Sequence, residues 1–205
     1  MGIYSKYIFP HIMDLALSGR AIARYRQNLL ANSQGNILEI GFGTGLNLPN
    51  YPSTVKTIAT IDVNPGMNSL AQTRIKATGI EVVQHLLTAE KMPFKENSFD
   101  TIVSTWTLCS IADIDQALEE VYRVLKPGGR FLFLEHGLSN ENKIQLWQNR
   151  LNGLQNILGD GCHLNRNITS LVKKQPWQIT EEQQFYIKDI PKIFAYMYQG
   201  IAIKK

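Results

Sequence analysis

The sequence predicts an α/β fold, with a mostly parallel sheet of seven strands, helices on both faces and an antiparallel strand pair at the C-terminus. Five short apolar runs alternate with stretches of helical pattern between residues 36 and 136. Such continuous apolar runs are typical of parallel strands that helices cover on both faces. Two further β-like runs end the chain. The length of 205 residues suits one domain with a large core.

The first 35 residues are expected to form a helical cap. Apolar residues recur at roughly helical spacing over residues 10–31, for example at Ile12, Leu15 and Leu30. The sequence NSQG at 32–35 then interrupts the pattern. A strand is expected immediately after this break.

The remaining elements follow in order along the chain. Strands are expected at 36–41, 57–63, 80–87, 99–106 and 129–136, and helices at 66–79, 113–129, 140–158 and 166–175. Lys126, Pro127 and two glycines form a stop signal for the second of these helices. The runs 178–190 and 194–205 have no helical pattern between them, so they are expected to pair at the sheet edge.

Composition excludes several classes of protein. The net charge of +4 is mild and no run of five basic residues occurs, so no nucleic-acid partner is expected. Two cysteines without a CxxC pair favour a reducing compartment. The apolar N-terminal stretch is interrupted by Lys6, Pro10, His11 and Asp14, short of the ~20 apolar residues of a membrane span. A soluble cytoplasmic protein without stable membrane insertion is expected, and the oligomeric state is left open.

The loop after the first strand is the first candidate binding feature. In LEIGFGTGLN (38–47), Gly41, Gly43 and Gly45 permit positive φ and close approach of a ligand. Ligands of open α/β sheets bind at the carboxyl ends of strands. A dinucleotide loop needs GxGxxG, whose third glycine would stand at Leu46, and the GKS or GKT of a phosphate loop is absent. The preceding Glu39 suits a ligand with an ammonium group and would repel a pyrophosphate.

Asp62 at the end of the second strand is the second candidate binding feature. It lies 17 residues after Gly45, where an acidic side chain can accept two hydrogen bonds from ribose hydroxyls. NAD and S-adenosylmethionine both carry that diol. Asp62 therefore supports a nucleoside ligand without choosing between the two.

The pattern Glu39-x-Gly41-x-Gly43-x-Gly45 resembles the first motif of class I S-adenosylmethionine-dependent methyltransferases, of the methyltransferase type 11 group with a Rossmann-like sheet. TAEKMPFKENSFDTIVS (88–104) and VLKPGGRFLFLEH (124–136) also resemble this class. The resemblance implies S-adenosylmethionine as cofactor and S-adenosylhomocysteine as product. It places Ala89 and Glu90 beside adenine, and it assigns further cofactor contacts to Thr44, Val63, Met67 and Thr105.

A narrower resemblance covers nearly the whole chain. STWTLCSI, FLEHG, the helix with Trp147 and Gln148, GDGCHLNR and AYMYQGIAIK are similar to the methyltransferase-like family 7, whose members methylate small thiols. The ubiquinone and menaquinone C-methyltransferases are more loosely similar. Family 7 proteins carry a membrane-anchoring N-terminus that this sequence does not show, so membrane attachment is not carried over. The resemblance implies methyl transfer to a small-molecule nucleophile, with a thiol favoured over a quinone ring or a lipid amine.

Two alternatives are weighed against this function. Amino-methyltransferases of nucleic acids have an Asn/Asp-Pro-Pro-aromatic motif after the fourth strand, where this chain has STWTLCS. A non-catalytic module that binds S-adenosylmethionine or a protein partner is a hypothesis of another class. One domain over 1–205 is expected, with a helical cap (1–35), a cofactor-binding core (36–136) and substrate-side helices with the closing strand pair (137–205).

His136 is the candidate catalytic residue because it follows the fifth strand, near the expected methyl group. With an ordinary pKa near ~6.5 it could act as a general base at pH 7. The alternative is a polar strand-end residue that lines the pocket. A thiol of pKa ~8.5 is already a few per cent ionised at neutral pH, whereas a phenol of pKa ~10 is about 0.1% ionised. A thiol acceptor therefore needs the weaker base.

GDGCHLNR (159–166) is interpreted as a turn that places Cys162, His163 and Arg166 along the substrate pocket. The alternative is a structural turn that caps the next helix through Asn165. Metal binding is not expected, because Cys162 and His163 are adjacent and no second ligand pair has zinc-like spacing. The apolar floor of the substrate pocket is assigned to Trp106, Leu108 and Trp147, and Tyr4 and Tyr7 are candidates to cover the sulfonium.

Overall fold

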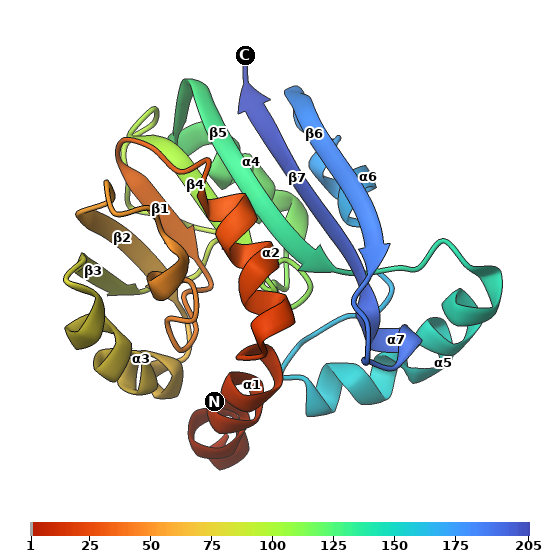
Figure 1. Cartoon of the computed structure of the whole chain (residues 1–205). Coiled ribbons are helices and arrows are strands. Elements are labelled where there is room, and N and C mark those ends of the chain that lie inside the picture. The colour runs from red at the N-terminus through yellow and green to blue at the C-terminus, as the bar shows by residue number, and fades with distance from the viewer. Residues whose placement is uncertain (1) are drawn as a thin grey trace.

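The computed structural model describes residues 2–205 and contains one seven-stranded sheet in the order β3-β2-β1-β4-β5-β7-β6 (Figure 1). The parallel part comprises β1 (Ile37–Ile40), β2 (Thr57–Asp62), β3 (Glu81–Leu86), β4 (Phe99–Thr105) and β5 (Leu125–His136). β7 (Tyr196–Lys204) is antiparallel to both β5 and β6 (Trp177–Tyr186). The predicted sheet and its antiparallel C-terminal pair are confirmed.

Helices cover both faces of the sheet, as the apolar strands predict. α2 (Arg20–Leu30) and α3 (Pro65–Thr78) pack on one face, and α4 (Ile114–Val124) and α6 (Ile168–Val172) pack on the other. Successive strand residues face opposite layers: Leu132 lies in the α2 and α3 core, while Phe131 and Phe133 lie in the α4 and α6 core. Because both faces of the sheet are buried, residues of both orientations are mostly apolar, and the strands appear in the sequence as continuous apolar runs.

The other helices lie near the carboxyl ends of the parallel strands. The chain begins with a π-helical turn (Tyr4–Ile8) and α1 (Phe9–Leu17), and a 3-10 turn (Leu48–Asn50) follows the loop after β1. α5 (Asn142–Leu158) and the short α7 (Lys192–Ala195) lie near the carboxyl end of β5 and the beginning of β7 in Figure 1.

Several element boundaries differ from the sequence prediction; for example, the helix predicted over 166–175 is limited to α6, Ile168–Val172. The helical stretch 10–31 is divided at Gly19, which is extended (φ −60°, ψ 144°) and starts α2. The helix predicted over 113–129 ends at Val124, and the segment with Pro127 joins β5, because Pro127 has no N–H to continue a helix and Gly128 takes φ 75°. The four residues of α7 separate the last two strands, where no helix was expected.

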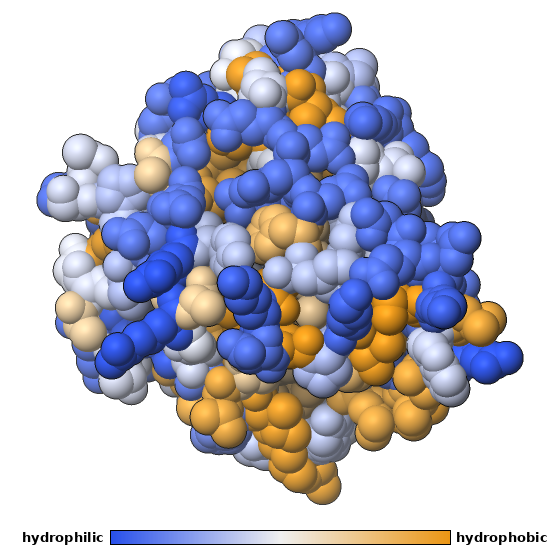
Figure 2. Space-filling view, turned by 45° about the vertical axis from the view of Figure 1, so that its right-hand side comes forward, coloured by the Kyte–Doolittle hydropathy of each residue, from blue (hydrophilic) through white to orange (hydrophobic). Residues whose placement is uncertain are grey.

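Large apolar side chains also lie on the outside of the molecule. They gather at its lower end in Figure 2, where α1 and α5 are found, and include Ile12 and Leu15 of α1 and Leu154 and Ile157 of α5. Leu15 is 81% exposed and Ile157 is 74% exposed. Among the described residues, 2–205, no helix has the length and apolarity required to cross a membrane.

Candidate functional site

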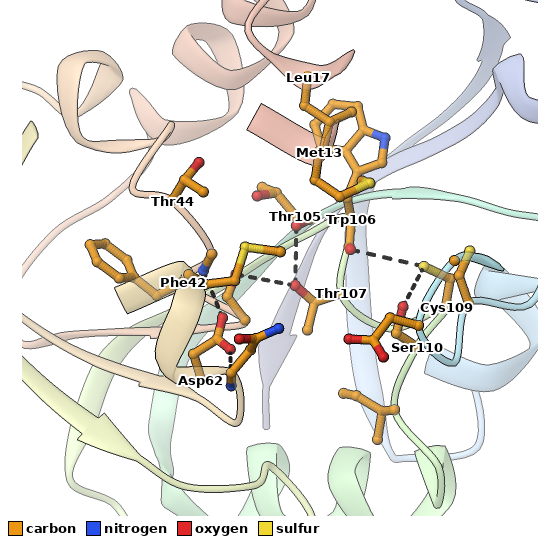
Figure 3. Close-up of a pocket in the computed structure, with 18 of the residues that line it drawn as sticks. Met13, Leu17, Phe42, Thr44, Asp62, Thr105, Trp106, Thr107, Cys109 and Ser110 are labelled. Atoms are coloured by element: carbon orange, nitrogen blue, oxygen red, sulfur yellow. Dashed lines mark hydrogen bonds between the residues drawn. The ribbon is translucent and has the colours of Figure 1, made fainter. Parts of the chain in front are cut away.

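A cavity of about 720 Å³ lies at the carboxyl ends of four parallel strands (Figure 3). Gly41 follows β1, Asp62 ends β2, Thr105 ends β4 and His136 ends β5, and all four line the cavity. Residues of α1, among them Met13 and Leu17, form its roof. The volume falls in the range of roughly 300–1,000 Å³ that is usual for small-molecule sites.

The glycines after β1 are required by the shape of the loop. Gly41 has φ 66°, and a Cβ there would lie 2.0 Å from Thr107 Oγ1, so only glycine fits. Gly43 has φ 57°, and a Cβ there would meet no atom closer than 3.9 Å. The space beside Gly43 therefore belongs to the cavity and is open to a ligand.

Asp62 joins the end of β2 to this loop. One carboxylate oxygen accepts a hydrogen bond from Gly43 N at 2.7 Å, and the other accepts from Asn64 N at 2.8 Å. Burial raises the pKa of Asp62 despite these bonds. Each oxygen retains acceptor capacity, because an ionised carboxylate has about four lone-pair sites.

Glu39 lies beneath the glycine loop in a buried polar network. Its carboxylate accepts hydrogen bonds from Asn47 Nδ2 at 2.9 Å and Tyr51 OH at 2.7 Å. Burial raises the pKa of Glu39 to about 7. Glu39 lines the cavity, and its assignment to a ligand ammonium group stays a prediction, because one donor on each oxygen leaves further acceptor sites on an ionised carboxylate.

Arg26 of α2 supplies the positive charge of this network. Its Nη1 donates to Asn47 Oδ1 at 2.6 Å and Thr105 Oγ1 at 3.0 Å, and its guanidinium lies 4.5 Å from the centre of the Trp106 ring. Burial lowers the pKa of Arg26 to about 10. Its Nε is buried and has no hydrogen-bond partner in the described part of the chain. Sequence analysis missed Arg26, because its hydrogen-bond partners Asn47 and Thr105 come from distant segments of the chain.

The roof is attached to the cofactor side by polar contacts from the N-terminal segment. Asp14 of α1 forms an ion pair with Arg74 of α3 at 2.7 Å and accepts from Thr44 Oγ1 at 2.5 Å. The backbone oxygen of Ser5 accepts from Asn64 Nδ2 at 2.8 Å, and Ser5 Oγ donates to Asp160 at 2.6 Å. The first helices therefore cover the cavity and contact the loops after β1 and β2.

Two thiols and an imidazole, from Cys109, Cys162 and His136, lie together in the cavity at the carboxyl end of β5. Ligand atoms of Cys109, His136 and Cys162 lie within 4.8 Å of one another, and all three residues are buried. His136 Nε2 is 3.0 Å from Cys162 Sγ. A hydrogen bond from Cys162, followed by the nearby His136 ring, holds the pKa of Cys109 well below its usual range. Burial opposes a charged His136 ring, but Cys109 raises the pKa of His136 overall.

Backbone contacts hold the loops that carry these cysteines. The buried carboxylate of Glu135 accepts from Thr107 N at 2.8 Å and Leu108 N at 3.1 Å. His163 N donates to Cys109 O at 2.9 Å, and Arg166 donates to Leu108 O. These contacts join the loop after β4 to the segment that contains Cys162.

The turn GDGCHLNR follows α5 and packs against the loop after β4. Asp160 and Gly161 both have positive φ, and a Cβ on Gly161 would lie 3.2 Å from Ser110 O. The next helix is capped by Asn167, whose Oδ1 accepts from Ser170 N, and not by Asn165.

Most of the predicted site residues line the cavity: Glu39, Gly41, Gly43, Thr44, Asp62, Val63, Met67, Ala89, Glu90, Thr105, Trp106, His136 and Cys162. Five do not. Gly45 shapes the turn behind the loop with φ 77°, Leu108 is completely buried, and Trp147 is 51% exposed on α5. The His163 ring lies between Asn152 and Asn156, and Arg166 is directed at a backbone oxygen.

Of the predicted substrate wall only Cys162 lines the cavity, and of the predicted apolar floor only Trp106 does. Tyr4 and Tyr7 also lie outside the cavity lining. Tyr4 OH donates to Leu158 O on α5, and Tyr7 is 59% exposed. Phe9 and Met13 of α1 occupy the roof in their place.

Comparisons with known proteins agree with the geometry. The family model described as "Methyltransferase domain" matches residues 38–133. The human thiol S-methyltransferase TMT1A is 32% identical, over 90% of this chain and 79% of that protein. The rat thiol S-methyltransferase TMT1B is 34% identical, over 75% of this chain and 61% of that protein. The crystal structure of the YcgJ protein from Bacillus subtilis superimposes with a TM-score of 0.70 at 19% identity, over 89% of this chain and 99% of that chain.

Proposed function

The chain belongs to the class I S-adenosylmethionine-dependent methyltransferases, and from that premise we propose that it methylates a small thiol. The observation that carries the choice of a thiol is the acceptor end of the cavity, which we define as Cys109, His136, Cys162, Ile187 and Phe194. It combines an imidazole and two thiols with apolar side chains. The similarity to thiol S-methyltransferases over most of the chain supports the same choice.

The cofactor side of the cavity fits S-adenosylmethionine on three counts. The Asp62 carboxylate retains acceptor capacity for the ribose diol, and Gly43 leaves open space beside it. Arg26 lines the cavity with an Nε that lacks a partner among residues 2–205, which suits the carboxylate of the methionine part. Ala89 and Glu90 line the cavity beyond Asp62 and are assigned to adenine.

Four further residues of the lining are assigned to the cofactor: Thr44, Val63, Met67 and Thr105. Bound S-adenosylmethionine supplies a methyl group activated by a sulfonium. The protein has to orient donor and acceptor, which can supply roughly 7–11 kcal/mol of the barrier. α1 covers part of the cavity, and this position suits a role in limiting the access of water to bound reactants.

The acceptor end can assist the loss of one proton. A thiol of pKa ~8.5 needs only a weak base or a positive field, while a phenol of pKa ~10 needs a dedicated base. His136 lines the cavity, and its Nδ1 is buried with no partner among residues 2–205. The His136 ring is therefore the candidate side chain to receive the proton of the acceptor thiol.

The test is a comparison of acceptors with a matched skeleton: 2-phenylethanethiol, 4-ethylphenol and 2-phenylethylamine. Each is incubated with the protein and methyl-deuterated S-adenosylmethionine, and the methylated product and S-adenosylhomocysteine are quantified by mass spectrometry. We expect the methyl thioether and S-adenosylhomocysteine in equal amounts, with the thiol about 30-fold faster than the phenol, the ratio of their ionised fractions at pH 7. Faster methylation of the amine or of the phenol would replace the thiol assignment. Binding of S-adenosylhomocysteine without any methylated product would favour the non-catalytic module.

A further inference from the structure

The cluster of Cys109, His136 and Cys162 has the composition and spacing of a metal site. A tetrahedral zinc ion with Zn–S of ~2.3 Å and Zn–N of ~2.0–2.1 Å separates its donor atoms by roughly 3.5–3.8 Å. Here the three donors lie within 4.8 Å of one another, and His136 Nε2 lies 3.0 Å from Cys162 Sγ. Movements of about 1 Å or less would bring all three to zinc distances.

The polar groups of the cluster have few partners outside it, although the Gln155 side chain contacts Cys162. Within residues 2–205, Cys109 Sγ has only two weak contacts beyond the cluster, with Trp106 O at 3.9 Å and Ser110 Oγ at 3.5 Å. His136 is 8% exposed, and its Nδ1 has no hydrogen-bond partner in the described residues. Buried polar groups in proteins are nearly always satisfied. The atoms that face one another in the cluster, Cys109 Sγ, Cys162 Sγ and His136 Nε2, have mainly one another as partners, and this favours a ligand that the three share.

The surrounding charges suit a divalent cation bound by two thiolates. Two thiolates and one neutral imidazole cancel the charge of Zn²⁺, so the occupied cluster is neutral. The nearby Glu135 is already engaged by Ser104 and by backbone N–H groups, and Arg166 donates to Leu108 O. Neither group needs the cluster as a partner.

The ligands are also held in place before any ion binds. Glu135 fixes the turn that leads to Cys109, and His163 N ties Cys109 O to the residue next to Cys162. Contacts of this kind orient the ligands of natural metal sites. The role of the GDGCHLNR turn is then to present one cysteine ligand and to lock the loop that carries the other.

We propose that Cys109, His136 and Cys162 bind one zinc ion at the acceptor end of the cavity, with an open fourth position for the sulfur of the acceptor thiol. Three protein ligands and one open position are the arrangement of catalytic zinc sites. All three residues line the cavity, so the open position faces the reactants. The inference rests on the proposed thiol methylation and names the group that would activate the acceptor.

The chemistry balances with this ion. The acceptor thiol binds zinc and releases its proton to solvent, since a coordinating thiol is deprotonated. An electron pair of the bound sulfur forms the new C–S bond to the methyl group, while the old C–S bond breaks and its electrons neutralise the sulfonium. The products are a methyl thioether, which leaves the metal, and S-adenosylhomocysteine. His136 then acts as a ligand, and no separate base is required.

The first experiment measures metal binding directly on the full chain under reducing conditions. Metal-free protein is titrated with Co²⁺, whose absorption reports thiolate ligation and tetrahedral geometry, and zinc content is measured after incubation with Zn²⁺ and removal of excess. We expect one ion per chain and a thiolate-to-cobalt band. Addition of 2-phenylethanethiol should shift the cobalt spectrum, whereas 4-ethylphenol should not. No cobalt band, or less than about 0.1 zinc per chain, overturns the proposal.

Variants then identify the ligands. Cys109→Ala and Cys162→Ala should each weaken zinc binding more than about 100-fold, because loss of an outer contact alone already costs 10–100-fold. His163→Gln is the matched control, since His163 adjoins Cys162 but its ring bonds to Asn152 and Asn156. It should retain the ion. Zinc binding that survives both cysteine variants, or that is lost in the control, contradicts the assignment, and thermal melting checks that each variant folds.

The same material separates this inference from the proposed function. If protein freed of zinc methylates 2-phenylethanethiol at the full rate, the metal proposal fails and thiol methylation stands. If cobalt binds and the thiol shifts its spectrum but no methyl thioether forms, the metal site stands and the proposed function fails. Full activity restored to metal-free protein by one equivalent of Zn²⁺ is the result expected when both are right.

Discussion

Replacing Asp62 by asparagine is expected to weaken binding of S-adenosylhomocysteine about 10- to 150-fold. Asp62 accepts from Gly43 N at 2.7 Å and Asn64 N at 2.8 Å, and its remaining acceptor capacity is assigned to the ribose diol. Asparagine keeps one oxygen acceptor, but its NH₂ group faces a backbone N–H, of Gly43 or of Asn64, that is also a donor. Loss of one charge-assisted hydrogen bond to the diol costs about 1.5–3 kcal/mol. This free energy corresponds to an increase in Kd of about 10- to 150-fold.

The assay is calorimetric titration of S-adenosylhomocysteine into wild-type and variant protein, with a thermal melt of each. Asp100→Asn is the matched control, because Asp100 accepts from Asn36 N at 2.8 Å and pairs with Lys126 but lies outside the cavity. The control should leave Kd within about twofold. An unchanged Kd in folded Asp62→Asn, or an equal loss in the control, would refute the reasoning.

The remaining predictions concern the network under the loop and the roof. Arg26→Met should weaken S-adenosylhomocysteine binding about 10- to 100-fold in calorimetry by removing the guanidinium assigned to the ligand carboxylate, and wild-type affinity would contradict that assignment. Burial raises the pKa of Glu39 from 4.5 to about 7. Between these pH values the folded state therefore binds one more proton than the unfolded state. The free energy of unfolding of the wild type should fall by up to about 3 kcal/mol as the pH rises from 4.5 to 7. Urea unfolding of Glu39→Gln should lack this fall, and parallel pH curves would refute it. Asp14→Asn breaks the part-exposed pair with Arg74 and should cost about 0–1 kcal/mol in urea unfolding, yet speed ligand dissociation several-fold in stopped flow; an unchanged dissociation rate would argue against α1 as a roof.

The sheet could be predicted because its signals are local and repeated. Each parallel strand is a short apolar run whose alternate residues are buried on opposite faces, as in β5, where Phe131 and Leu132 face different layers. Element ends were less predictable. Gly19 divides a helical stretch, and Pro127 joins a strand, because in each case a single backbone preference decides against a longer periodic pattern.

The cofactor side was also accessible from sequence, since consecutive strand ends meet at one edge of a parallel sheet. That rule brings Gly43 and Asp62 together, and the structure joins them by a hydrogen bond. Arg26 was missed because its partners, Asn47 and Thr105, come from distant segments. No local pattern distinguishes a buried arginine of this kind from an exposed one on the same helix.

The acceptor end was the least predictable part. The same rule places Cys109 after β4 near His136 at the end of β5, but Cys162 reaches them only through the fold of a loop beyond α5. The sequence predicted that Cys162 and His163 both line the substrate pocket, whereas the His163 ring bonds to Asn152 and Asn156. The side chains of these two neighbours point in different directions, so sequence proximity was misleading there.

The most direct test of the account is a crystal structure of the protein with S-adenosylhomocysteine and 2-phenylethanethiol bound together. We expect the ribose diol on Asp62, and the sulfur of the cofactor directed toward the acceptor end beside His136, with the acceptor sulfur facing it. A cofactor bound away from Asp62, or an acceptor outside the cavity under α1, would contradict the central claim that this cavity brings a methyl donor and a thiol together.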